Sequence, residues 1–443
     1  MASEYIFQRN SRAELPSAFS GSGCYIHDNK GNTYLDGSGG AAVSCLGHSD
    51  EHVKNAIIQQ AQQLSYAHTS FFTTEVAEKL ATRLARYAPG DINRVYLVSS
   101  GSESIEAALK LARQYFVEIG QNDRRQIITR KQSYHGNTLG ALASGGNQWR
   151  RKQFEPLLID TTLISPCYEY RYKLGGETEE AYGSRIANEL ETEIIRLGES
   201  NVMAFLLEPV VGATAGAICP VNGYLKRVRE ICDKYGILLI FDEVMCGMGR
   251  TGSLFACDID GVVPDILTIA KGLGAGYQPI GAMLCQDYIH DVIKNGSGYF
   301  QHGHTYLGHP IAAAAADAVL DRLVDDKLLD DVNKKGQILV HKLKKVFDNH
   351  PNIGDIRGRG LFIGIEIVEN RKSKNPFDHS LNIAGKIKNN AFSEGLICYP
   401  AQGTIDGKSG DHVLIAPPFI ISEEEINILV ERLSLAIQNS ISI

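Results

Sequence analysis

A carboxylate and a lysine each follow an apolar run in one short part of the chain. Residues 237–241, ILLIF, are apolar and end at Asp242, and residues 266–270, ILTIA, end at Lys271. Apolar runs of this length, bounded by turn residues, are typical of strands buried on both faces of a parallel sheet. Because ligands bind just beyond the carboxyl ends of such strands, we expect Asp242 and Lys271 to lie in one site.

This pair could bind a pyridine cofactor that carries an aldehyde. A lysine amine can form a Schiff base with a carbonyl group. Pyridoxal phosphate bound in this way acts as an electron sink when its ring nitrogen is protonated, and an aspartate is the usual partner of that nitrogen. We therefore predict Lys271 as the Schiff-base lysine and Asp242 as the partner of the ring nitrogen. For two isolated residues, a capping aspartate and a solvated strand-end lysine would be the better interpretation.

A turn earlier in the chain is suited to an anion. Residues 95–98 predict a short strand, and the turn SSGSES at 99–104 leads into a helical pattern. The start of a helix offers free backbone N–H groups and the positive end of its dipole. A plain serine cap with a glutamate in the first turn is the alternative. Taken with the lysine and the aspartate, the turn predicts that Gly101 and Ser102 bind the phosphate.

The sequence resembles the class III aminotransferases, which are pyridoxal-phosphate enzymes of fold type I. The likeness extends from about Tyr25 to Ile421. It implies an α/β fold, with a large domain built on a mostly parallel sheet and a smaller α+β domain. The matching features are the apolar residues before Asp242-Glu243-Val244, the turn GMGRTG at 247–252, Asp265 and the pair Ala270-Lys271.

The resemblance also implies roles for residues outside this stretch. It implies that Tyr134 stacks on the cofactor ring, that Glu208 touches the site, and that Thr305 reaches the phosphate held by the other subunit. The active unit would then be a homodimer or a dimer of dimers with shared sites. The implied cofactor contacts are Gly101, Ser102, Tyr134, His135, Glu208, Asp242, Val244, Lys271 and Thr305. The implied substrate contacts are Tyr25, Phe71, Ala213 and Tyr399.

One departure from the family concerns substrate recognition. Many members carry an arginine in a GL-x-x-R-P stretch, and it binds the α-carboxylate of one substrate. Here residues 395–400 read GLICYP, so Tyr399 stands at that place. Lys408 or Arg150 could bind a carboxylate instead. For Arg150 and its neighbour Arg151, exposure to solvent is the preferred interpretation.

The chain of 443 residues is long enough for more than one domain. Strands and helices alternate through the central region, which predicts a doubly wound sheet. We predict an N-terminal segment over 1–60 that packs with the small domain. The large cofactor-binding domain is predicted over 61–324. The small domain is predicted over 325–443, where charged helices alternate with the apolar stretches 361–368 and 413–415.

Composition excludes several classes of protein. The formal net charge is −7 and there is no long basic cluster, so we expect no nucleic-acid partner. The apolar stretches are shorter than the ~20 residues of a membrane span, and residues 1–16 lack the apolar part of a secretory signal. Nine scattered cysteines without a C-x-x-C pair predict a reducing, cytoplasmic location. The spacing of His302, His304 and His309 matches no common zinc pattern, so no metal is expected.

The predicted activity is transfer of an amino group. The donor would be an ω-amino acid, a diamino acid or a simple amine, and the acceptor a keto acid, either pyruvate or 2-oxoglutarate. Two alternatives stay open at this stage. The first is another reaction of the same cofactor and scaffold, namely that of an aminomutase, racemase or decarboxylase. The second is a protein that binds pyridoxal phosphate without catalysis.

Overall fold

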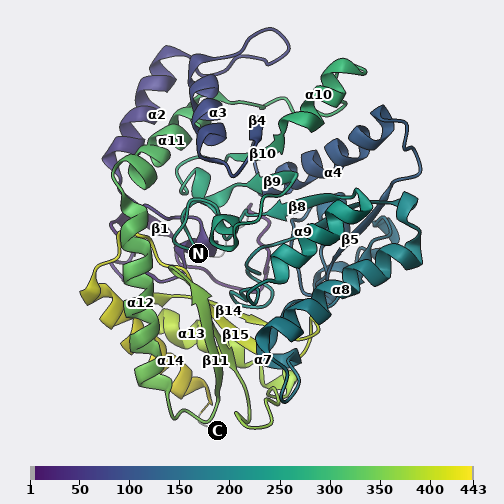
Figure 1. Ribbon diagram of the computed structural model, residues 1–443. Helices are drawn as coiled ribbons and strands as arrows, with labels where there is room; N and C mark the ends of the chain where they lie inside the picture. Colours follow the sequence, from purple (N-terminus) through teal and green to yellow (C-terminus); the bar gives the residue numbers. More distant parts are fainter. Residues whose placement is uncertain (1–4, 442–443) are drawn as a thin grey trace.

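A seven-stranded sheet forms the centre of the protein in this computed structural model, which describes residues 5–441 (Figure 1). The strand order is β4-β10-β9-β8-β7-β5-β6. Neighbouring strands from β9 to β6 are parallel, and β10 runs antiparallel to both β4 and β9. The predicted α/β fold with a mostly parallel sheet is confirmed. The strands are β4 (Ile92–Val98), β5 (Gln126–Arg130), β6 (Thr162–Ile164), β7 (Val202–Leu207), β8 (Leu238–Asp242), β9 (Ile266–Ile269) and β10 (Gly281–Gln286).

Helices cover both faces of this sheet. Successive residues of a strand point to opposite faces. Leu206 and Ile240 pack on the side of α4, whereas Phe205 and Leu239 pack on the side of α8 and α9. Burying each such side chain contributes about 1.5–3 kcal/mol, which fixes the register of the central strands. The covering helices are α4 (Gly101–Glu118), α5 (Leu139–Ser144), α8 (Glu179–Leu197), α9 (Tyr224–Tyr235) and α10 (Asp287–Asn295). Two short helices do not cover the sheet: α6 (Gln148–Arg151) packs on α5, and α7 (Glu169–Tyr172) carries Arg171, which forms an ion pair with Glu366.

Further helices pack beside β4 and lead to the second sheet. The alanine-rich helix α11 contacts both α2 and α3. Its small side chains allow this close approach, and its residues 312–320 are buried. Regular α structure ends at Leu320, and a π turn, Asp321–Asp325, follows. The helices are α1 (Gly39–Ala42), α2 (Glu51–Gln63), α3 (Glu75–Tyr87), α11 (Pro310–Leu320) and α12 (Leu328–Phe347).

A four-stranded antiparallel sheet occupies the C-terminal part, with the order β11-β12-β15-β14. Helices α12, α13 and α14 pack around it at the lower end of the molecule in Figure 1. The domain boundaries at residues 60 and 324 stay a prediction. The elements are β11 (Ile353–Arg359), β12 (Phe362–Ile367), α13 (Ile383–Ser393), β14 (Tyr399–Gln402), β15 (Asp411–Ile415) and α14 (Glu423–Ile441).

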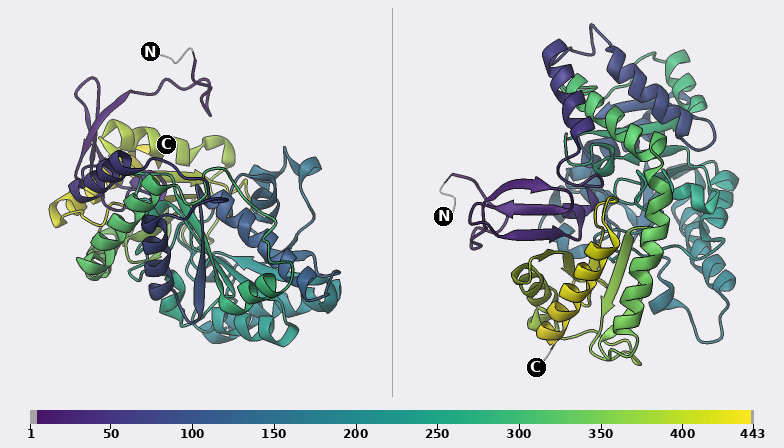
Figure 2. Two further views of the ribbon diagram at one scale, coloured as in Figure 1. Left: turned by 90° about the horizontal axis from the view of Figure 1, so that it is seen from above. Right: turned by 90° about the vertical axis from the view of Figure 1, so that its left-hand side faces the viewer.

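A small N-terminal sheet projects from the body of the protein (Figure 2). Strands β2 and β3 pair antiparallel and form a hairpin. The fourth strand comes from the other end of the chain, because β13 pairs parallel to β3 with Leu396 opposite Leu35. This sheet therefore ties the two ends of the sequence together. Its strands are β1 (Ala18–Ser22), β2 (Tyr25–Asp28), β3 (Thr33–Asp36) and β13 (Leu396–Ile397).

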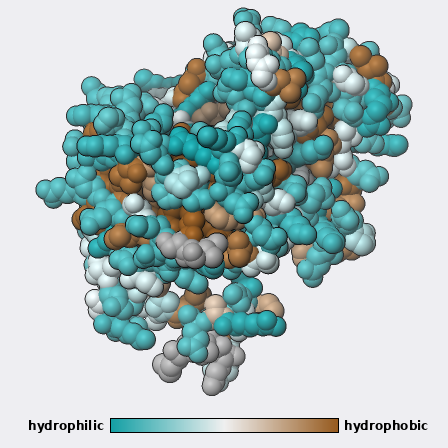
Figure 3. All heavy atoms as spheres, turned by 90° about the horizontal axis from the view of Figure 1, so that it is seen from below, coloured by the Kyte–Doolittle hydropathy of each residue, from teal (hydrophilic) through white to brown (hydrophobic). Residues whose placement is uncertain are grey.

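The surface is rich in hydrophilic side chains, as expected for a chain in which 21% of the residues are charged. Seen from below, it is mainly hydrophilic, with apolar side chains in separate patches (Figure 3). Within residues 5–441, no helix has the length and apolar character needed to cross a membrane.

Candidate active site

A cavity of about 300 Å³ opens at the carboxyl ends of the central strands. Five strands, β4, β5, β7, β8 and β9, contribute residues to it, each from the strand end or from the loop that follows. Local patterns predict four of these residues and the family resemblance implies the others, and the fold brings them to one place. They are Gly101 and Ser102 after β4, Tyr134 and His135 after β5, Glu208 after β7, Asp242 and Val244 at the end of β8, and Lys271 after β9.

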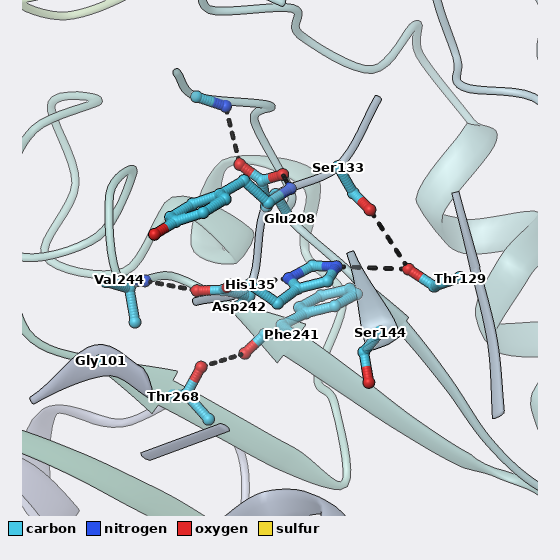
Figure 4. Close-up of polar contacts among 12 residues, drawn as sticks. Gly101, Thr129, Ser133, His135, Ser144, Glu208, Phe241, Asp242, Val244 and Thr268 are labelled. Atoms are coloured by element: carbon cyan, nitrogen blue, oxygen red, sulfur yellow. Dashed lines mark hydrogen bonds and ion pairs between the residues drawn. The ribbon is translucent and has the colours of Figure 1, made fainter. Parts of the chain in front are cut away.

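Asp242 is a buried carboxylate, 3% exposed, on the wall of this cavity. Its Oδ2 lies 2.7 Å from Nδ1 of His135, and its Oδ1 accepts the Val244 N–H at 3.0 Å. An ionised carboxylate only accepts, so the His135 proton is assigned to Nδ1. On the other side of the ring, Nε2 of His135 lies 3.3 Å from the Thr129 hydroxyl (Figure 4). His135 thus orients Asp242 from behind and leaves it facing the cavity.

The Lys271 side chain enters the same cavity. Among residues 5–441, no hydrogen bond or ion pair engages its Nζ. Burial lowers the pKa of this amine, and Asp242 and Glu208 oppose that shift. The neutral amine, which is the form that attacks a carbonyl, is therefore populated at lower pH than in an exposed lysine. The Lys271 backbone has a φ of 42°, a left-handed conformation that costs about 1–3 kcal/mol and is typical of functional sites.

The start of α4 forms another wall of the cavity. The Ser100 hydroxyl accepts the Glu103 N–H at 3.2 Å, so the predicted serine cap is present. The N–H groups of Gly101 and Ser102, at the first two helical positions, have no partner within the helix. They border the cavity, together with the positive end of the helix dipole. The serine cap and an anion site are therefore compatible, and both occur at one helix terminus.

Gly101 allows α4 to begin directly against Val244. A Cβ added at Gly101 would lie 2.7 Å from Cγ1 and 3.1 Å from Cγ2 of Val244. We therefore expect Gly101→Ala to lower the free energy of unfolding by about 1–3 kcal/mol through overpacking. Denaturant titration of the apoprotein measures this loss. Adding Val244→Ala to the same chain should recover part of it, and a Gly101→Ala protein as stable as the parent would contradict the close packing.

Glu208 holds the backbone of the segment that carries Tyr134. Its Oε1 accepts the Tyr134 N–H at 3.0 Å, and its Oε2 accepts the Gly212 N–H at 2.8 Å. Burial raises the pKa of the Glu208 carboxyl above its ordinary value, and Asp242 adds to that rise. The Tyr134 ring lines the cavity. Glu208 therefore fixes where this ring lies.

These walls fit pyridoxal phosphate. The cavity has a partly buried lysine whose amine has no partner among the described residues, a buried carboxylate, an aromatic ring and a helix start with free N–H groups. They match an aldehyde, a protonated ring nitrogen, a ring face and a phosphate, respectively. Among the residues described, no group of three or more His, Cys, Asp or Glu side chains could hold a metal ion.

Two of the four predicted substrate contacts lie near the cavity. Ala213 lines it. Tyr399 packs against the apolar cluster that contains Ala213. Tyr25 instead lies beside Glu425 and Arg432 of α14, close enough for both to affect the pKa of its phenol, which burial raises.

Phe71 and Thr305 belong to a different region of the chain. Phe71 is 79% exposed, and Thr305 lines a separate cavity of about 570 Å³ with His68, Thr69 and Ser70. Neither residue lines the cavity of Lys271 in its own chain. Their predicted roles stay predictions, because they require a second subunit.

The arginine pair on α6 differs from the expectation of solvent exposure. Arg151 is partly buried, and its guanidinium donates to the carbonyls of residues 142, 143 and 145. Arg150 lies over the Tyr134 ring, with Cζ 4.6 Å from the ring centroid. Sequence reasoning left this contact out, although the short spacing from Tyr134 to the glycines before α6 was a usable sign of a tight turn.

Comparison with known proteins gives a consistent result. Residues 7–437 match the family Aminotransferase class-III. An uncharacterized aminotransferase of Schizosaccharomyces pombe is 44% identical, over 99% of this chain and 96% of its own length. The uncharacterized aminotransferase YodT of Bacillus subtilis is 42% identical, over 98% and 97%.

Solved structures show the same likeness. An (S)-enantioselective omega-transaminase from Thermomicrobium roseum superposes with a TM-score of 0.93 at 33% identity, covering 100% of this chain and 97% of its own. The omega transaminase of Pseudomonas jessenii, in complex with PMP, gives a TM-score of 0.90 at 31% identity, covering 96% and 93%.

Proposed function

Because this chain belongs to the class-III aminotransferase family and is a pyridoxal-phosphate-dependent aminotransferase of fold type I, we propose a specific donor and acceptor class for it. The donor is an ω-amino acid, a diamino acid or a simple amine, and the acceptor is pyruvate or 2-oxoglutarate. The observation that carries the proposal is the shared cavity of Lys271 and Asp242, which lie at the ends of adjacent strands.

The chain's own residues would divide the work in this cavity. Bound pyridoxal phosphate supplies an electron sink for a carbanion. Lys271 would hold the cofactor through Nζ and, once released, would move a proton to and from the substrate carbon as general base and acid. Asp242, oriented by His135, would favour a proton on the ring nitrogen. The first N–H groups of α4 would bind the phosphate, and Tyr134 would cover the ring.

A panel of amine donors tests the proposal. Purified holoenzyme is mixed with each donor and with pyruvate or 2-oxoglutarate, and the cofactor absorbance is followed. We expect the absorbance to change with at least one donor of the proposed class and to return when a keto acid is added. If donors change the absorbance and no keto acid restores it, amino transfer to these acceptors is refuted.

We further propose that each site is built from two chains. Thr305 lies outside the Lys271 cavity of its own chain. Its carbonyl accepts a hydrogen bond from the Tyr66 hydroxyl at 2.7 Å, which fixes the loop and leaves the Thr305 hydroxyl for another partner. In the family resemblance, this threonine reaches the phosphate of the other subunit. A homodimer, or a dimer of dimers, would bring Thr305 of one subunit to the phosphate bound in the other.

Removing the Thr305 hydroxyl should weaken cofactor binding. Thr305→Val keeps the shape of the side chain and deletes its donor. A hydrogen bond to a charged group is worth about 1.5–3 kcal/mol, so the affinity for pyridoxal phosphate should fall by about one to two decades. Fluorescence titration of the apoprotein measures it.

A mixed dimer distinguishes the shared site from a local effect. One chain carries Thr305→Val and the other carries Lys271→Ala. In the shared arrangement, one site contains both defects and the other contains neither, so the second site should bind and turn over like the parent. A mixed dimer as inactive as the Lys271→Ala homodimer would refute action across subunits.

A cytoplasmic location remains part of the proposal. All nine cysteines are free, and eight of them are buried. Reduced cysteines are typical of a reducing compartment, which supports the location without identifying it.

A further inference from the structure

A second cavity adjoins the Lys271 cavity. It has a volume of about 270 Å³, and both cavities share Ala213 in their walls. Its polar lining includes Asn147 before α6, Arg150 of α6, Thr214 after β7, Gln402 at the end of β14 and His379. The second cavity therefore lies between the large sheet and the C-terminal sheet, next to the place where the reaction occurs.

The guanidinium of Arg150 in this second cavity stacks on aromatic rings and makes no hydrogen bond to the described residues. Its guanidinium lies over the rings of Tyr134 and Trp149, at 4.6 and 5.8 Å from their centroids. Among residues 5–441, no carboxylate or carbonyl accepts a hydrogen bond from it. Two neighbouring side chains already have hydrogen-bond partners. The Thr214 hydroxyl donates to the Gln132 carbonyl at 2.5 Å, and the Gln402 side-chain amide donates to the His379 carbonyl at 2.9 Å.

A guanidinium in this state is suited to a carboxylate. It carries five N–H donors in a planar fork that matches two carboxylate oxygens. The stack on Tyr134 fixes the plane of the fork without using its N–H groups. Arg151 makes a useful contrast, because its guanidinium donates to carbonyls of its own chain. Of the two neighbouring arginines, only Arg150 lines the second cavity, and none of its guanidinium N–H groups donates to the described residues.

The turn that follows β14 packs on the helix that carries Arg150. Residues 403–410 form a closed turn, with the Gly403 N–H donating to the Gly410 carbonyl at 2.7 Å. A Cβ added at Gly407 would lie 3.0 Å from the Trp149 nitrogen, so this turn packs directly on the backbone of α6. The stretch in which Tyr399 stands at the arginine position therefore continues into a turn that packs on α6 and lines the same cavity as Arg150.

We propose that Arg150 binds the carboxylate of an ω-amino acid substrate and so selects that donor class. The inference rests on the proposed amino transfer. The amine-bearing carbon must reach Lys271 in the first cavity, whereas Arg150 lines the second. A carboxylate on the reacting carbon would stay in the first cavity. A carboxylate at the far end of an alkyl chain can pass Ala213 and reach Arg150.

Two other cations provide matched controls. Lys408 is an exposed residue of the supporting turn. Arg9 is also exposed and lies near Tyr134. Burial raises the pKa of Tyr134, and both Arg150 and Arg9 oppose that rise. Lys408→Gln and Arg9→Gln remove the same charge from the same region. They separate a specific carboxylate contact from a general loss of positive potential.

The experiment compares parent holoenzyme with Arg150→Gln, Arg150→Lys and the two controls. The first measurement is the specificity constant for 5-aminopentanoate relative to pentylamine in the donor half-reaction. The second is the Kd of pentanoate, which has no amine and cannot react, by calorimetry. A charge-assisted pair of hydrogen bonds predicts that Arg150→Gln lowers the acid-to-amine ratio about 10- to 100-fold and raises the Kd of pentanoate by a similar factor. Arg150→Lys should lie between the parent and Arg150→Gln.

The outcomes separate this inference from the proposed function. Equal ratios and equal Kd values for parent and Arg150→Gln would overturn the role of Arg150. The same loss in Lys408→Gln or Arg9→Gln would also overturn it, since the effect would then be general. Amino transfer from pentylamine without any binding of pentanoate would refute the inference and leave the aminotransferase intact. Pentanoate binding that depends on Arg150, without transfer to any keto acid, would support the inference and refute the proposed reaction.

Discussion

Lys271→Ala is expected to abolish turnover in a protein that still folds and still binds pyridoxal phosphate. The side chain enters the cavity without a hydrogen bond or ion pair among the described residues, so few native contacts are lost with it. A positioned general acid–base group contributes about 10²–10⁴-fold, and the covalent link to the cofactor is lost as well. We therefore expect turnover to fall by about four decades or more, measured as steady-state amino transfer.

Chemical labelling identifies the lysine directly. Borohydride treatment of parent holoenzyme, followed by peptide mapping, should place the reduced cofactor on Lys271. The Lys271→Ala protein should bind the cofactor reversibly and lose it on dialysis after the same treatment. A label on another lysine, or near-normal turnover by Lys271→Ala, would show that the site has been assigned to the wrong residue.

The second large effect is expected for Asp242→Asn. The asparagine oxygen can still accept the His135 N–H, so the geometry behind the ring should survive. The negative charge is lost, however. An opposite charge within about 4–6 Å shifts a neighbouring pKa by about 1–3 units. The protonated fraction of the ring nitrogen, and with it turnover, should therefore fall by about one to three decades while the cofactor stays bound.

The next residue in the chain offers a matched control. Glu243 is fully buried on the opposite side of the strand end, where its carboxylate accepts the N–H groups of Ala256 and Cys257 at 2.6 and 2.8 Å. Burial raises its pKa to about 7. Glu243→Gln should lower stability more than it lowers turnover. If Asp242→Asn turns over like the parent, or if Glu243→Gln loses as much activity, a specific role for the Asp242 charge is refuted.

Local sequence patterns were sufficient to predict that Asp242 and Lys271 lie at the ends of buried strands. The apolar runs before Asp242 and Lys271 are buried strands, because continuous apolar residues can be satisfied on both faces of a covered sheet. The end of each apolar run is then enough to predict where Asp242 and Lys271 lie in the fold. The antiparallel strand β10 was not predicted, because nothing in residues 281–286 reveals the direction in which the strand joins its neighbours.

Contacts between distant segments could not be read from the sequence. Arg150 lies only sixteen positions after Tyr134 (150 minus 134), yet its stack depends on a turn of the chain between β5 and α6. The surroundings of Tyr25 depend on α14, about four hundred positions later. A side chain's exposure is decided by such partners, and a pattern within one segment does not contain them.

The pairing of β3 with β13 has a consequence for the synthesis of the protein. Leu35 meets Leu396, so 361 positions (396 minus 35) separate the two strands. At about 5–20 residues per second, a ribosome needs roughly 20–70 s to make that interval. During this time the free edge of β3 can pair with another nascent chain, as unpaired strand edges do. The β2–β3 hairpin is therefore made early, and this edge of β3 stays unpaired until β13 has been made. Chaperones that shield strand edges would act on it in the interval.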